Sequence, residues 1–85
     1  MIFDKVELDE VTYDVTGQLR IKDDDEVKII FEDLMFGNAL KDLNAKEKTI
    51  DHLALKNSEE TRYDTKKVKV SHLTIDGKFY HATFK

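Results

Sequence analysis

The sequence predicts an α+β domain, in which an antiparallel sheet of about five strands carries one helical segment on one face, in the order β-βββ-α-ββ. Three observations lead to this prediction. Apolar and polar residues alternate over 11–31, apolar residues recur every three or four positions between 36 and 54, and an Asp-Gly pair at 76–77 separates two β-rich runs. The 85 residues are enough for a single domain, 1–85, with a core of modest size.

In the stretch 11–31 the apolar residues fall almost entirely on odd positions, which is typical of strands with one buried face. Turn-forming residues at 16–18 and 23–25 divide this stretch into a three-stranded meander. The expected register places apolar pairs on one face and opposite charges on the other. The predicted pairs are Val15 with Leu19, Tyr13 with Ile21, Ile21 with Val27, Leu19 with Ile29, Asp14 with Arg20, Thr12 with Lys22, and Lys22 with Glu26.

Another strand is predicted at 2–8, where it would form an edge of the sheet. Its apolar residues Ile2, Val6 and Leu8 occupy even positions, whereas the meander uses odd positions. A bulge or a tight bend at 9–10 would explain this change of phase, because one extra residue turns the following side chains to the other face.

The helical segment is predicted at about 38–56. The residues Asn44 to Glu47 resemble a capping box, so the helix either runs through this point or restarts there, with a short turn at 38–43 and a longer helix at 45–56. The apolar residues with helical spacing are Phe36, Leu40, Leu43, Ile50 and Ala54, and we expect Ile50, Leu53 and Ala54 to pack on the odd-numbered face of the meander.

Three large apolar residues, Leu34, Met35 and Phe36, follow the expected end of the meander. Small monomers seldom expose large apolar patches, which favours a core position for this run under the helix. The alternative is an exposed docking point for a partner.

The C-terminal stretch 66–84 is predicted to be a β-hairpin around Asp76-Gly77. With these two residues as the loop, Ile75 would face Lys78, Leu73 would face Tyr80, and His72 would face His81. A turn with a glycine bulge would instead place His72 opposite Tyr80. Both faces of this hairpin are partly apolar, so it is expected either at the centre of the sheet or at an interface.

The charge of the chain is unevenly distributed. Residues 1–33 hold eleven acidic and four basic residues, a net charge of −7, whereas the whole chain has a net charge of −4. In the predicted register the unpaired acidic residues gather at the ends of strands, where they would form an acidic rim for a partner with a basic surface. The candidate binding residues are Asp9, Glu10, Asp23, Asp24, Asp25 and Glu26.

No recognisable catalytic constellation is present, so we predict a protein that is not an enzyme and has no catalytic residue, metal or cofactor. The chain has no cysteine, its three glycines are too dispersed for a phosphate loop, and Asp23 to Glu26 do not follow the calcium-loop pattern. Two histidines at 72 and 81 are a weak metal signal without a third ligand. The absence of cysteine, of a signal-like start and of a long apolar run favours a cytoplasmic protein without a membrane segment.

These features favour a small protein-binding module, such as an inhibitor, an immunity protein, an antitoxin or a phage accessory protein. The main alternative is an assembly protein that forms a homodimer through the C-terminal hairpin. A weaker alternative is nucleic-acid binding through the basic stretch Arg62 to Lys69, which the acidic pI of about 5.3 opposes.

Overall fold

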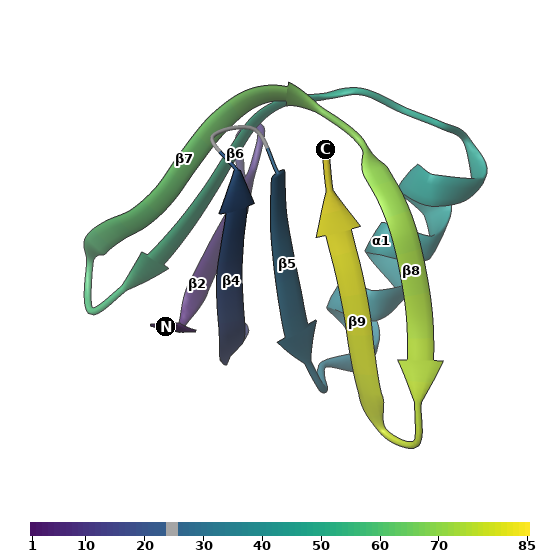
Figure 1. Cartoon of the computed structure of the whole chain (residues 1–85), viewed down its shortest axis with the longest axis horizontal. Coiled ribbons are helices and arrows are strands. Elements are labelled where there is room, and N and C mark those ends of the chain that lie inside the picture. Colours follow the sequence, from purple (N-terminus) through teal and green to yellow (C-terminus); the bar gives the residue numbers. More distant parts are fainter. Residues whose placement is uncertain (24–25) are drawn as a thin grey trace.

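The structure is a computed structural model that describes residues 1–23 and 26–85, and these form two antiparallel sheets and one helix (Figure 1). The five-stranded sheet has the order β1-β4-β5-β9-β8, and the four-stranded sheet has the order β3-β2-β6-β7. The α+β class and the antiparallel pairing are therefore confirmed, whereas the number and order of the strands differ from the prediction. The elements are β1 (Ile2–Phe3), β2 (Lys5–Leu8), β3 (Val11–Tyr13), β4 (Gly17–Asp23), β5 (Glu26–Phe31), α1 (Leu34–Ala45), β6 (Ile50–Asn57), β7 (Glu60–Val68), β8 (Val70–Asp76) and β9 (Phe79–Phe84).

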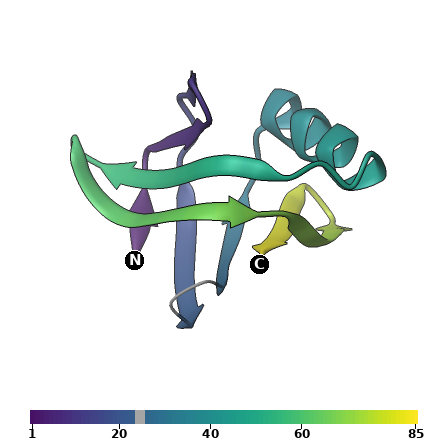
Figure 2. The same cartoon turned by 90° about the horizontal axis from the view of Figure 1, so that it is seen from above.

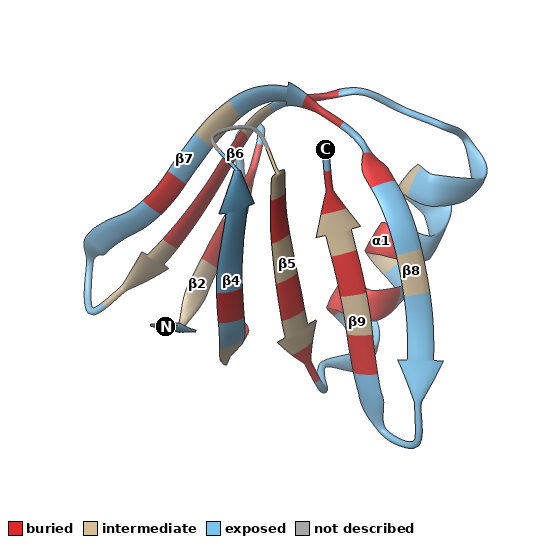
Figure 3. Ribbon diagram, in the orientation of Figure 1, coloured by how far each residue is buried: buried red, intermediate tan, exposed pale blue. Residues whose placement is uncertain are grey.

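The strands of the two sheets cross one another, and the helix closes one side of the space between them (Figure 2). One cluster of buried apolar side chains fills this space, with contributions from both sheets and from Phe36 and Leu40 of α1 (Figure 3). Aromatic rings join the helix to the five-stranded sheet, because the ring of Phe36 lies 4.8 Å from that of Phe31, which stacks on Tyr80 at 5.1 Å. The core thus consists of residues that are far apart in the sequence.

The predicted strand at 2–8 is divided at Asp4 into β1 and β2, which belong to different sheets. The backbone N–H of Asp4 donates to the carbonyl of Lys56 at 2.8 Å, and its carboxylate accepts the N–H of Ser58 at 3.0 Å. The change of phase therefore falls at Asp4, so that Phe3 and Val6 are both buried while Ile2 is exposed. Only β1 lies at an edge, because β2 lies between β3 and β6.

The predicted meander is confirmed in its second half. Strands β4 and β5 pair with Leu19 opposite Ile29 and Ile21 opposite Val27, as expected. The predicted pair of Lys22 with Glu26 is wrong, because an irregularity between Ile21 and Asp23 places Asp23 opposite Glu26. Positions 24 and 25 of this turn lie outside the described residues.

The first half of the predicted meander is wrong. Strand β3 pairs with β2 and not with β4, so that Val6 lies opposite Tyr13. The chain turns tightly at 9–10, where Asp9 has a φ of 57°, and then passes to the other sheet before β4. The predicted pairs that this arrangement removes are Val15 with Leu19, Tyr13 with Ile21, Asp14 with Arg20, and Thr12 with Lys22.

The helix spans Leu34–Ala45. It begins before the predicted segment 38–56 and ends where the predicted longer helix at 45–56 would begin. Asp33 is the N-cap, and its carboxylate accepts the N–H of Phe36 at 2.8 Å. At the other end, the N–H of Glu47 donates to the carbonyl of Asn44 and that of Lys48 donates to the carbonyl of Leu43. These two bonds form a Schellman motif, with Glu47 in the left-handed conformation at a φ of 50°. The predicted capping box is therefore a helix C-terminus.

Residues 50–56 form strand β6, so the predicted helix at 45–56 is wrong. Strand β6 lies between β2 and β7, and Leu53, Ala54 and Leu55 are all buried in it. Ala54, on the outer face between longer side chains, adds to Ile50 and Leu53 on the chain and so imitates the three- and four-residue spacing of a helix. Ile50 and Leu53 do belong to the core, whereas Ala54 lies opposite Glu7 and Asp64 of the neighbouring strands.

The C-terminal hairpin is confirmed as β8 and β9, but its register differs from both predicted alternatives. The loop consists of Gly77 and Lys78, with a φ of 63° at Gly77, as in a type II′ turn. Ile75 therefore faces Tyr80 and Leu73 faces Ala82, so that the predicted pairs are shifted by two residues. Residues 66–68 belong to β7, which pairs with β6 in the other sheet.

The apolar run at 34–36 is split between core and surface. Phe36 is completely buried, as the core prediction requires, but Leu34 and Met35 in the first turn of α1 are 65% and 82% exposed. The core prediction is therefore wrong for these two residues, because the helix turns only one side of this segment toward the sheets.

Candidate functional site

The outer face of the five-stranded sheet is covered by neither the helix nor the other sheet, and we call it the open face. Even positions of β4 and β5 and odd positions of β9 point to this side, since the alternate residues Leu19, Ile29 and Ala82 are buried in the core. Two rows of side chains cross the open face. The first consists of Gln18, Ile30, His81 and Thr74, and the second consists of Arg20, Lys28, Thr83 and His72.

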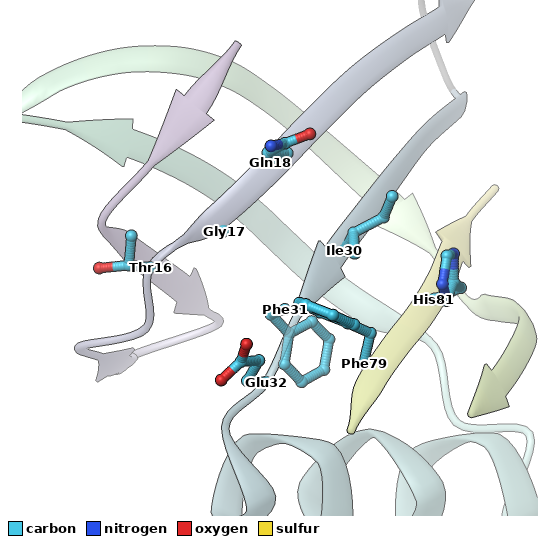
Figure 4. A pocket seen from close by; sticks show the side chains of 8 residues that line it. All are labelled: Thr16, Gly17, Gln18, Ile30, Phe31, Glu32, Phe79 and His81. Atoms are coloured by element: carbon cyan, nitrogen blue, oxygen red, sulfur yellow. The ribbon is translucent and has the colours of Figure 1, made fainter. Parts of the chain in front are cut away.

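A hollow of about 410 Å³ lies at the first row, and its lining is mainly apolar (Figure 4). Ile30 and Phe79 provide apolar surface, and Phe79 is 41% exposed. The residues that line the hollow are Thr16, Gly17, Gln18, Ile30, Phe31, Glu32, Phe79 and His81. The hollow is thus formed by the start of β4, the end of β5 and β9.

Gly17, which lines this hollow, allows a close contact on the core side of β4. A Cβ atom at this position would lie 2.3 Å from the carbonyl oxygen of Ile30 and 2.7 Å from the ring of Phe3. The ring of Phe3 therefore packs directly against the backbone of β4, a close approach that requires glycine. The prediction placed Gly17 in a turn, but in the structure it is the first residue of β4.

The second row contains two cations directly opposite one another, Arg20 on β4 and Lys28 on β5. Within the described part of the chain, neither side chain forms an ion pair. A hollow of about 210 Å³ lies between these cations and Ile30, and Gln18 and Ile30 line both hollows. The cation pair and the apolar hollow are therefore adjacent parts of one surface.

The margins of the open face carry ion pairs. The Nζ of Lys78 lies 3.6 Å from a carboxylate oxygen of Glu32, and that of Lys85 lies 3.9 Å from Glu26. Both acidic groups thus contact a lysine at the margin, and in the described part of the chain neither forms an ion pair with Arg20 or Lys28. Among the residues that the structure describes, the open face thus has an apolar hollow, a cation pair that forms no ion pair, and two ion pairs at its margins.

The outer face of the four-stranded sheet has the opposite character, because its charges are paired. The Nζ of Lys56 lies 2.6 Å from the Glu7 carboxylate, and this hydrogen bond raises the pKa of Lys56. The Nε2 of His52 lies 2.9 Å from Asp64. These contacts give Lys56 and Asp64 partners within the protein itself.

A further pair joins β7 to the start of β6. The Nζ of Lys67 donates to Asp51 at 2.8 Å. This hydrogen bond, and secondly the attraction between the two charges, lowers the pKa of Asp51 and raises that of Lys67. Lys67 belongs to the basic stretch at 62–69, in which Arg62 also contacts an acid, Glu60, at 3.4 Å. Two of the cations proposed for nucleic-acid binding are therefore engaged in ion pairs.

The acidic residues predicted to bind a partner are divided between two places. The turn between β2 and β3 lies at one edge of the view in Figure 2, and the end of β4 with the start of β5 lies at the opposite edge. At the first place, the carboxylate of Asp9 accepts the backbone N–H of His52 at 3.0 Å, and Glu10 is exposed beside it. At the second place, Asp23 lies opposite Glu26. Asp24 and Asp25 lie outside the described residues, and binding by these acidic residues stays a prediction.

The predicted histidine pair is wrong. His72 lies opposite Thr83, and His81 lies opposite Thr74, because the loop contains Gly77 and Lys78. Within the residues that the structure describes, no three side chains of His, Cys, Asp or Glu are grouped so that they could hold a metal ion. The two histidines nevertheless share the open face, where His81 lines the larger hollow.

Sequence reasoning missed the open face as a site, although part of the signal was present. The correctly predicted pair of Leu19 with Ile29 also implies that Arg20 faces Lys28. The predicted meander also gives Arg20 an acidic neighbour, Asp14, on its other side, and the structure removes this neighbour because β3 lies in the other sheet. The positions of Phe79 and His81 beside Ile30 depend on the pairing of β5 with β9, which no local pattern predicts.

Comparison with known proteins adds no further assignment. In the described part of the chain, no helix combines the length and apolar character needed to cross a bilayer. No protein-family model matches this chain, and no curated protein or solved structure matches it either.

Proposed function

We propose that this chain is a small, non-enzymatic, intracellular module that binds another protein on the open face of its five-stranded sheet. An inhibitor, an immunity protein, an antitoxin or a phage accessory protein would act in this way. The observation that carries the proposal is the pair of Arg20 and Lys28, which has no ion-pair partner among the described residues and lies beside the exposed apolar hollow at Ile30 and Phe79.

Two physical arguments support this proposal. Like charges directly opposite each other in a sheet are unfavourable for folding, so the pair of Arg20 with Lys28 does not serve stability. Protein interfaces are enriched in aromatic residues and arginine around an apolar centre, and the open face presents Phe79, Ile30 and Arg20 in such an arrangement. The paired charges on the other sheet offer no comparable surface.

Site-specific photo-crosslinking in the native host tests the proposal. A photoreactive p-benzoylphenylalanine is incorporated at Thr74 on the open face and, as a matched control, at Lys66 on the outer face of the four-stranded sheet. Both positions are exposed. We expect a discrete crosslinked protein from position 74 and none from position 66. Crosslinks of equal yield at both positions, or none at position 74, would contradict the proposed surface.

Self-association through the C-terminal hairpin is a second candidate function. Ile75 and Phe79 of this hairpin are 50% and 41% exposed, which leaves apolar surface near its turn. Sedimentation equilibrium at high protein concentration tests this candidate. A monomer under these conditions excludes it, whereas a dimer dispersed by Ile75→Lys would support it.

A further inference from the structure

The open face has two parts with different chemistry, and their spacing restricts what can bind. Ile30, which lines the apolar hollow, and Lys28, in the cation row, are two residues apart on β5. Alternate residues on one face of a strand are separated by about 6.6–6.8 Å. A ligand that covers both parts must therefore present an apolar group and an anionic group about this far apart.

We propose, on the basis of the function proposed above, that the partner presents an extended acidic segment to the open face. A large apolar side chain of that segment enters the hollow at Ile30 and Phe79, and a carboxylate two residues later lies against Arg20 and Lys28. An extended peptide has the same spacing between alternate side chains as the strands beneath it. The recognised pattern is an apolar residue, any residue, and then Asp or Glu.

The cation pair explains why the segment must be acidic. A neutral or basic partner that covered Arg20 and Lys28 would remove water from two like charges without supplying a counter-charge, and this is unfavourable. A carboxylate placed between the two side chains would compensate both. It would also relieve the repulsion that exists in the unbound protein.

The same charges make two other occupants less suitable. A second copy that docked symmetrically through its own open face would bring cations against cations. A single-stranded nucleic acid needs basic groups along its path. Here Glu26 and Glu32 lie at the margins of the open face, and the chain has a net charge of −4. A short acidic segment confines its charge to the centre, where the cations are.

An NMR titration of the complete protein at low salt tests this inference. The probe is the capped peptide Ser-Phe-Ser-Glu-Ser-Glu-Gly, and the comparison probes are the same peptide with both Glu residues replaced by Gln and a 12-nucleotide oligothymidylate. We expect the Glu peptide to shift amide signals of β4, β5 and β9, with an affinity that falls as salt is added. The Gln peptide should bind at least about tenfold more weakly.

Lys28→Glu is the decisive variant, because it places opposite charges at 20 and 28 and should therefore fold at least as well as the natural chain. We expect this variant to lose peptide binding, whereas Lys66→Glu, which changes the same charge on the other sheet, should retain it. Equal binding of the Glu and Gln peptides, unchanged binding by Lys28→Glu, or tighter binding of the oligonucleotide would overturn the acidic segment. If crosslinking at position 74 persists in such a case, the proposed function stands and only the nature of the segment is wrong.

Discussion

The two sheets of this protein differ in whether charged side chains on their outer faces have partners within the chain. On the four-stranded sheet, Lys56 forms an ion pair with Glu7, and His52 forms a hydrogen bond with Asp64. On the five-stranded sheet, Arg20 lies opposite Lys28 without an acidic partner in the described part of the chain. The anionic partner that we propose would supply the counter-charge on the second face. The two sheet faces therefore differ in the charge that they present to a ligand.

The largest effect is expected at Gly17, where β4 lies against the ring of Phe3. Gly17→Ala should lower the free energy of unfolding by about 1–3 kcal/mol, because the new methyl group would collide with the carbonyl oxygen of Ile30 and the ring of Phe3. Urea denaturation measures this loss. An unchanged midpoint would mean that Phe3 and the backbone of β5 can move aside, and would contradict a requirement for glycine at this position.

A change remote from both faces provides a reference for smaller effects. Glu47→Gly should raise stability by about 0.4–1 kcal/mol, because residue 47 ends the helix in the left-handed conformation, which glycine adopts without strain. Thermal denaturation measures this gain, and peptide binding should not change. A loss of stability would show that the Glu47 side chain contributes a contact that outweighs the backbone effect.

Replacing one cation of the open face should also stabilise the protein. Lys28→Glu converts a repulsive pair into an attractive one, for which we expect a gain of roughly 0.2–1 kcal/mol. The melting temperature should rise. Added salt should stabilise the natural chain by screening the repulsion between Arg20 and Lys28, and should destabilise the variant by screening the new attraction. A fall in melting temperature would contradict the description of Arg20 and Lys28 as an uncompensated pair.

Double-mutant cycles compare the two faces directly. The cycle of Glu7→Gln with Lys56→Met should give a favourable coupling energy, because the two side chains form an ion pair at 2.6 Å. The cycle of Arg20→Met with Lys28→Met should give a coupling energy of opposite sign. Equal signs in the two cycles would remove the distinction between a paired face and an unpaired face.

The smallest effect concerns pH. Lys67 lowers the pKa of Asp51, so their pair contributes stability above the unfolded pKa of Asp51, near 3.8, and loses it as the pH falls through the lower folded value. The raised pKa of Lys67 has the opposite sense, with stability present below about 10.5 and lost as the pH rises through the higher folded value. Lys67→Met should flatten the stability profile at both ends, and urea midpoints between pH 2 and pH 12 measure this. A profile that keeps its slope in the variant would assign the pH dependence to other groups.

The hairpin of β4 and β5 could be predicted from the sequence because the alternation and the turn signal lie close together in the chain. The partner of Val11–Tyr13 could not be predicted, because its alternation suits pairing with either neighbouring strand. The helix prediction at 45–56 failed because β6 is a central strand, and its consecutive buried residues resemble one side of a helix. The candidate site shares this limit, since Arg20 opposite Lys28 follows from a local register but Phe79 beside Ile30 does not.

The sequence by itself determined which side of β4 and β5 faces the core, since Leu19, Val27, Ile29 and Phe31 are buried as their alternation predicts. It also determined the presence of a hairpin near the C-terminus. Only the tertiary structure decided that the chain divides at Asp4, with β1 in one sheet and β2 in the other. It also decided that β9 lies beside β5 and completes the open face. The physical reason is that backbone hydrogen bonds join any two strands almost equally well. The choice among partners therefore depends on how apolar side chains from distant segments pack between the two sheets.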